Sequence, residues 1–83
     1  MEPAVTNARH ADHVNGLVKQ VDQNAQGLNF ELQTSTGHLM NFTCEKECRA
    51  TLGHLQRHIR EKAKTDVYYI EGPNNSLIAL DVD

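Results

Sequence analysis

The stretch VNGLVKQV, residues 14–21, decides how the first strand of this protein runs. Val14, Gly16 and Val18 alternate on one side, as in a half-buried strand, but Val21 follows Val18 after three residues instead of two. One extra residue of this kind is what a β-bulge supplies. A glycine inside a strand is typical of a sharp bend or of a close approach by another backbone. We therefore predict a bent first strand with one bulge.

Two further strands are predicted at residues 28–34 and 38–44, joined by a hairpin turn that ends in Gly37. Apolar and polar residues alternate strictly in the first of them, and the alternation resumes in the second. The side chains predicted to point inward are Leu28, Phe30, Leu32, Met40, Phe42 and Cys44.

The period of the apolar residues then changes from two to about three and a half, which predicts a helix at about residues 45–63. Gly53 indicates either a kink in this helix or a later start near Thr51. Strands rich in β-forming residues are predicted at 66–72 and 77–83. The residues that share the apolar face of the helix are Cys48, Leu52, Leu55 and Ile59.

The predicted element order is β-β-β-α-β-β, and from about residue 13 to 83 it resembles the OB-fold family, a small partly open barrel. The bent first strand, VNGLVKQV, adds to this resemblance. An SH3-like barrel and an open sheet have the same order and stay open as alternatives. We expect a mainly β (α+β) fold with a single domain at 13–83 and a disordered tail at 1–12.

Composition limits the classes of function. The 83 residues carry a net charge of -3, and only 5% are aromatic, which argues against a general nucleic-acid binder. The N-terminus has no signal-peptide pattern, and no apolar run is long enough to span a membrane, so we expect a cytoplasmic protein without membrane partners. Two cysteines are too few for a disulfide scaffold, so we expect reduced thiols.

The pattern C-x3-C-x5-H-x3-H at residues 44–58 resembles a zinc motif. A helix rises 1.5 Å per residue, so the first and last of these residues lie too far apart to share one ion. His54 and His58, spaced i and i+4, remain the only metal candidates, and no further ligands are identified. We expect no metal, no cofactor and no enzymatic activity, with Cys48 as a small core residue.

Two surfaces are candidates for binding. The basic residues fall on the outer face of the predicted helix, and of the adjacent tyrosines, which must face opposite sides of a strand, one is exposed. These partner-binding candidates are Lys46, Arg49, Arg57, Arg60, Lys64 and Tyr68. The OB resemblance implies a ligand face on the second and third strands, where the candidates are Asn29, Glu31, Gln33, His38 and Asn41.

We expect a small non-catalytic domain that binds another protein. The alternative is an OB-type module for single-stranded nucleic acid, which needs exposed aromatic and basic side chains that this face lacks. The sequence leaves the oligomeric state open.

Overall fold

The structure is a computed structural model that describes residues 11–25, 27–45 and 48–83. In chain order the elements are β2 (Asp12–Asn24), β3 (Gly27–Thr34), β4 (Leu39–Cys44), α1 (Leu52–Glu61), β5 (Lys64–Glu71), the short 3-10 helix η1 (Pro73–Asn75) and β6 (Leu77–Val82). The predicted tail at 1–12 falls mostly outside the described residues, and β2 begins at its last position, Asp12.

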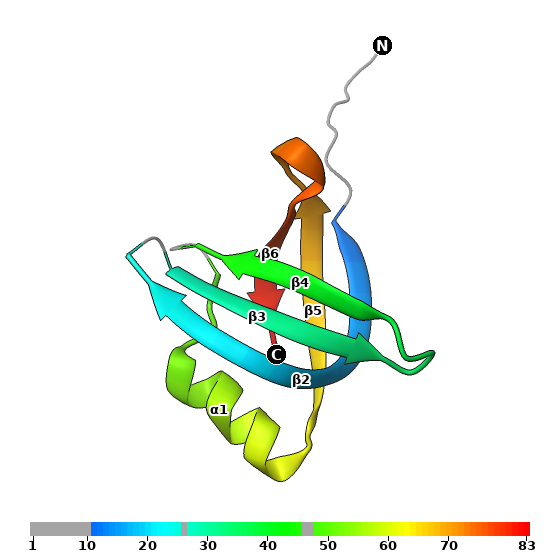
Figure 1. Cartoon of the computed structure of the whole chain (residues 1–83), viewed down its shortest axis with the longest axis vertical. Helices are drawn as coiled ribbons and strands as arrows, with labels where there is room; N and C mark the ends of the chain where they lie inside the picture. The colour runs from blue at the N-terminus through cyan, green and yellow to red at the C-terminus, as the bar shows by residue number, and fades with distance from the viewer. Residues whose placement is uncertain (1–10, 26, 46–47) are drawn as a thin grey trace.

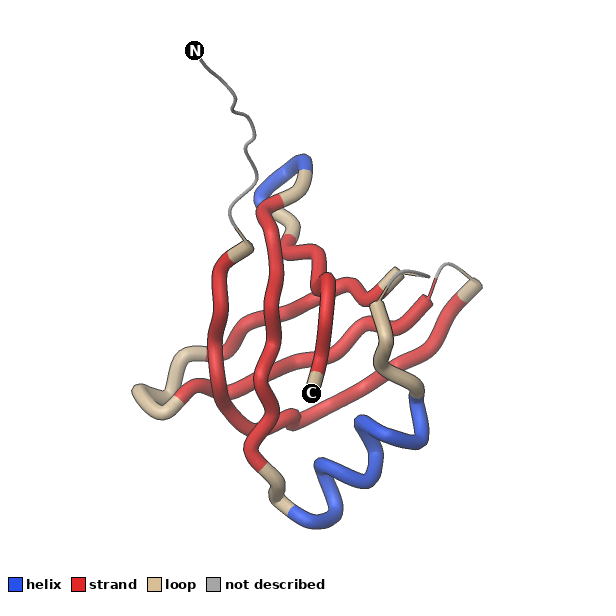
Figure 2. Tube along the Cα trace, turned by 180° about the vertical axis from the view of Figure 1, so that it is seen from behind, coloured by secondary structure: helices blue, strands red, loops and turns tan. Residues whose placement is uncertain are grey.

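The five strands form a closed barrel in the order β2-β3-β4-β6-β5 (Figure 1). All neighbours are antiparallel except β4 and β6, which run parallel over two residue pairs. Helix α1 contacts β2 and lies across one end of the barrel, as the view from behind also shows (Figure 2). The prediction of a small, mainly β barrel with one helix is confirmed, the open-sheet alternative is excluded, and the arrangement is consistent with an OB-like barrel.

The bend and bulge predicted in β2 are present. Residues 12–17 of β2 pair with β5, and from Gly16 onward the strand pairs with β3. The register with β3 shifts between Val18 and Gln20, where the extra residue was expected. Gly16 is buried, and a Cβ there would overlap the carbonyl oxygen of Gln33. The missing side chain therefore lets β3 cross the bend at short range.

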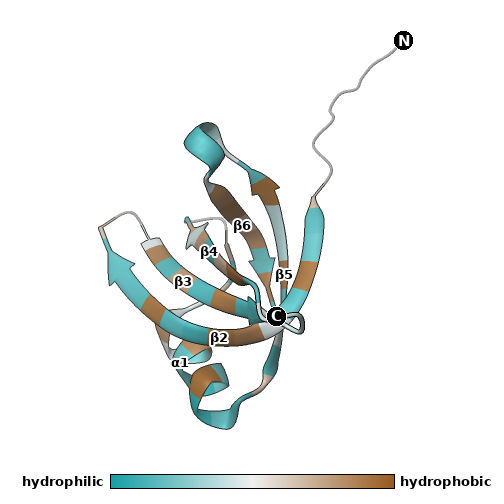
Figure 3. Cartoon of the chain, turned by 45° about the vertical axis from the view of Figure 1, so that its right-hand side comes forward, coloured by the Kyte–Doolittle hydropathy of each residue, from teal (hydrophilic) through white to brown (hydrophobic). Residues whose placement is uncertain are grey.

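The core fills the barrel with inward residues from all five strands, and the alternation of apolar and polar residues appears as stripes of hydropathy along β2 and β3 (Figure 3). Phe30 and Phe42 are buried and stacked, and Tyr69 packs edge-on against Phe42. The predicted inward residues are confirmed, with Met40 only partly buried. Tyr68 points outward with 44% of its surface exposed, as expected for the neighbour of an inward tyrosine.

The helix begins seven residues later than the predicted 45–63 boundary and ends at Glu61. Thr51 is its N-cap, because its side-chain oxygen accepts a hydrogen bond from the backbone N–H of His54 at 3.1 Å. Lys62 ends it in the left-handed conformation. Leu55 is fully buried as predicted, but Cys48 lies before the helix and does not share its face.

The prediction of reduced thiols is wrong, because Cys44 and Cys48 form a disulfide. Both residues are buried, and Cys44 ends β4. The backbone N–H of Cys48 also donates to the carbonyl of Glu45 at 2.9 Å, which makes a tight turn. The bond thus attaches the segment before α1 to the end of β4. Among the helices of the described residues, none is long and apolar enough to cross a membrane.

Gly16→Ala should lower the free energy of unfolding by about 1–3 kcal/mol, because the added methyl group must displace the backbone of β3. Gly53→Ala is the matched control: that position on α1 faces open space, so alanine should raise the free energy of unfolding by roughly 1 kcal/mol. Urea denaturation of the three proteins measures both changes. A wild-type midpoint in Gly16→Ala would contradict the close crossing.

Reduction of the disulfide should lower the free energy of unfolding by about 2 kcal/mol, since the loop that it closes is short. Urea denaturation with and without a phosphine reductant measures the difference. The double variant Cys44→Ala/Cys48→Ala is the control, and its stability should not depend on the reductant. If the reductant leaves the wild-type protein equally stable, the disulfide does not constrain the chain as described.

Candidate ligand-binding face

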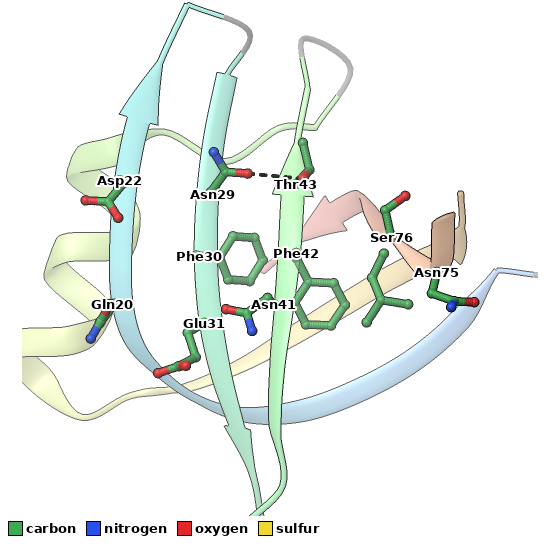
Figure 4. Close-up of a pocket in the computed structure, with 11 residues that line it drawn as sticks. Gln20, Asp22, Asn29, Phe30, Glu31, Asn41, Phe42, Thr43, Asn75 and Ser76 are labelled. Atoms are coloured by element: carbon green, nitrogen blue, oxygen red, sulfur yellow. Dashed lines mark hydrogen bonds between the residues drawn. The ribbon is translucent and has the colours of Figure 1, made fainter. Parts of the chain in front are cut away.

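The pairing of β2, β3 and β4 places six polar side chains next to one another on the outer side of the sheet. Each strand contributes two of them, and they stand in two rows across the sheet (Figure 4). One row is Gln20, Glu31 and Asn41, and the other is Asp22, Asn29 and Thr43. We call these six residues the polar face. The bulge after Val18 decides which residues of β2 belong to the polar face. It keeps Val18 and Val21 facing the core, so Gln20 and Asp22 point outward.

A hollow of about 310 Å³ lies on the polar face and continues to the loop before β6. Buried Phe30 and Phe42 also line it, and so do Asn75, Ser76 and Leu77 (Figure 4). The Thr43 hydroxyl donates a hydrogen bond to the Asn29 side chain at 3.1 Å, and the Ser76 hydroxyl donates to the Pro73 carbonyl at 2.8 Å. These bonds fix polar groups at both ends of the hollow.

The chemistry of this hollow is acidic and amide-rich. Asp22 and Glu31 are its carboxylates, and no lysine, arginine or histidine is present among the described residues that line it. Its two aromatic rings are buried, so neither offers a stacking surface to a base. The arrangement suits groups that donate hydrogen bonds or carry positive charge.

Three of the five residues predicted from the OB resemblance, Asn29, Glu31 and Asn41, belong to the polar face. Gln33 stands in the next row, between Leu17 and Leu39. His38 is in the exposed hairpin turn, where its backbone N–H donates to the Thr34 hydroxyl. Sequence reasoning missed Gln20 and Asp22, although the bulge that it predicted is the signal that places them.

The basic residues do not form the single helical stripe that was predicted. Arg57 and Arg60 are exposed on α1, but Arg49 precedes the helix and Lys64 begins β5. Lys46 lies outside the described residues. Arg57 donates to Glu61 at 3.2 Å in an exposed pair, which stabilises the helix only slightly.

Around Tyr68, the outer side of β2 and β5 carries a polar cluster that the sequence did not reveal. The ring of His13 stacks on Tyr68 with centroids 4.6 Å apart. The Asp66 carboxylate is hydrogen-bonded to Asn15 at 2.8 Å and to the His13 ring nitrogen Nε2 at 2.9 Å. These hydrogen bonds hold the pKa of Asp66 below its ordinary value, and the one from Asn15 has the larger effect.

His54 and His58 lie close together, with 2.9 Å between their Nε2 atoms. The Nδ1 atom of His58 is 2.7 Å from the hydroxyl of buried Thr65. Burial and the neighbouring His54 lower the pKa of His58. In the described part of the chain, histidine, cysteine and acidic side chains do not gather in groups of three or more that would fit a metal ion.

Comparison with known protein families finds none that matches this chain, and comparison with curated proteins finds no significant relative. The surfaces of the molecule itself are therefore the guide to its function.

Asn15→Ala should raise the pKa of Asp66 toward its ordinary value of 3.8, because the strongest hydrogen bond to the carboxylate is lost. An NMR titration of the Asp66 side-chain carbon measures it. The lowered pKa stabilises the fold above pH 3.8, and this contribution is lost as the pH falls through the folded-state pKa. Equal titration midpoints in wild type and Asn15→Ala would contradict the assignment.

Proposed function

We propose that this chain is a non-catalytic, OB-like domain that binds another protein, by accepting an extended, positively charged segment on its polar face. The observation that carries the proposal is the composition of the hollow, where two carboxylates stand among amides and hydroxyls. Lysine and arginine side chains pair with carboxylates, while the amides and hydroxyls exchange hydrogen bonds with a peptide backbone.

The surroundings of the polar face support an extended partner segment. Its adjoining row, Leu17, Gln33 and Leu39, carries the most exposed large apolar side chain of the described residues, Leu39 at 55%. Residues 39–42 of β4 pair with β3 but not with β6, within the ladders that the described strands form. A strand edge of this kind hydrogen-bonds to an added extended chain, and Leu39 supplies an apolar contact beside it.

The same features weigh against single-stranded nucleic acid. Phosphates need basic side chains and bases need exposed rings, and the polar face offers carboxylates in their place. The OB-like assignment itself is supported by the strand order and by the helix between β4 and β5.

The cytoplasmic location stays a prediction. The Cys44–Cys48 disulfide weighs against it, because disulfides persist mainly in oxidising compartments.

A decapeptide of alternating lysine and serine should bind the polar face, whereas the same peptide with glutamate in place of lysine, and a dodecamer of deoxythymidine, should not. Titration of the isotopically labelled chain at low salt, followed by NMR, measures this binding. The expected shifts concentrate at Leu39, Asn41 and Glu31. Shifts on the polar face with the oligonucleotide but not with the lysine peptide would favour the nucleic-acid alternative and contradict the proposal.

Asp22→Asn/Glu31→Gln should weaken binding of the lysine peptide about fivefold, because ion pairs at a protein surface contribute roughly 0.5 kcal/mol each. The control Glu61→Gln/Asp81→Asn removes the same charge from α1 and β6, away from the polar face, and should retain wild-type affinity. If both double variants lose affinity equally, the peptide responds only to net charge and the assigned face is wrong.

A further inference from the structure

Hydrogen bonds between α1 and the start of β5 fix the orientation of one histidine. The hydroxyl of Thr65 donates to the backbone carbonyl of Ala63 at 3.3 Å. With its proton directed at Ala63, the Thr65 oxygen accepts a hydrogen bond from the Nδ1 atom of His58, 2.7 Å away. A neutral imidazole carries one proton, so the Nε2 atom of His58 holds a lone pair.

That lone pair points to a second imidazole. The Nε2 atom of His54 lies 2.9 Å from the Nε2 atom of His58, one helical turn away. Both side chains are partly exposed, so solvent reaches the pair. In the metal-free chain the His54 Nε2–H donates to the lone pair of His58, and when that proton moves to Nδ1 of His54, both Nε2 atoms carry a lone pair that a metal ion can bind.

The separation of these nitrogen atoms is set by their hydrogen bond, and it is also one that a chelating pair can adopt. With metal–nitrogen bonds of about 2.0–2.1 Å, two nitrogen atoms 2.9 Å apart subtend an angle of about 90° at the metal. That is the angle between neighbouring ligands in square-planar or tetragonal coordination, the geometry of Cu²⁺ and Ni²⁺. A tetrahedral Zn²⁺ ion needs a wider separation, about 3.3 Å at the same bond length.

We propose that His54 and His58 form a two-histidine chelate for Cu²⁺ or Ni²⁺ through their Nε2 atoms, with Thr65 as the positioning residue that holds the His58 tautomer. Donation of the other ring nitrogen to a fixed oxygen is the usual support of a metal-binding histidine. Water occupies the remaining coordination positions.

Calorimetric titration of the full, untagged chain with Cu²⁺ at neutral pH tests the site. The expected result is one equivalent bound more tightly than any other, with electron paramagnetic resonance showing two equivalent nitrogen ligands. His54→Gln and His58→Gln should each weaken this binding at least about tenfold. His38→Gln removes an exposed histidine from the hairpin turn and should leave the affinity unchanged.

Variants of Thr65 test whether its hydrogen bond to His58 contributes to metal binding. Thr65→Ser keeps the hydroxyl and should keep the affinity, whereas Thr65→Val should weaken Cu²⁺ about tenfold while the circular dichroism spectrum stays native. Equal Cu²⁺ affinity in wild type and in the double variant His54→Gln/His58→Gln overturns the proposal. A resonance spectrum with a single nitrogen ligand overturns it as well.

Discussion

The close crossing at Gly16 is the constraint on which the rest of the barrel depends. One strand, β2, supplies partners for both β5 and β3, and the change of partner happens where Gly16 pairs with Thr34 on one side and with Thr65 on the other. A side chain there would meet the backbone of β3, so β2 and β3 would have to move apart at this bend. Without this bend β2 cannot reach β5, and the barrel loses its closure.

The bulge that follows the bend decides what the barrel shows to solvent. Successive side chains of a strand face opposite sides, so a slip of one residue exchanges the two faces. The extra residue between Val18 and Gln20 keeps Val21 opposite Phe30 in the core and leaves Asp22 opposite Asn29 outside. A single local irregularity thus fixes both the packing of the aromatic core and the carboxylate at one corner of the polar face.

Features that depend on neighbouring residues were predictable from the sequence. The bulge, the buried Phe30 and Phe42 and the opposite orientations of Tyr68 and Tyr69 all follow from the period of two in a strand. The start of α1 was predicted too early. Cys48 continues the helical spacing of the apolar residues, although the N-cap is at Thr51. Two cysteines four residues apart are compatible both with one turn of a helix and with a loop closed by a disulfide, so the spacing alone did not predict the bond.

Features that join distant parts of the chain were not predictable from spacing. Asn15 and His13 contact Asp66 only because β2 pairs with β5. In the sequence each of them is more than fifty positions away from Asp66. The OB resemblance located three residues of the polar face because that family places ligands on two neighbouring strands. It did not locate Gln20 or Asp22, since the contribution of β2 depends on the bulge and not on the family pattern.

The hydrogen-bonded histidines show how a structural requirement and a binding site differ. Thr65 is fully buried, and its hydroxyl needs partners because an unsatisfied polar group in a core costs about 1–3 kcal/mol. His58 meets that need, so its orientation is explained by the fold alone. His54 has no such role: its backbone is bonded to the Thr51 cap, while its ring is directed at the lone pair of His58. The ring of His54 is positioned by this hydrogen bond and by its edge-on contact with the His58 ring, and chelation is the role that the proposal gives to this second imidazole.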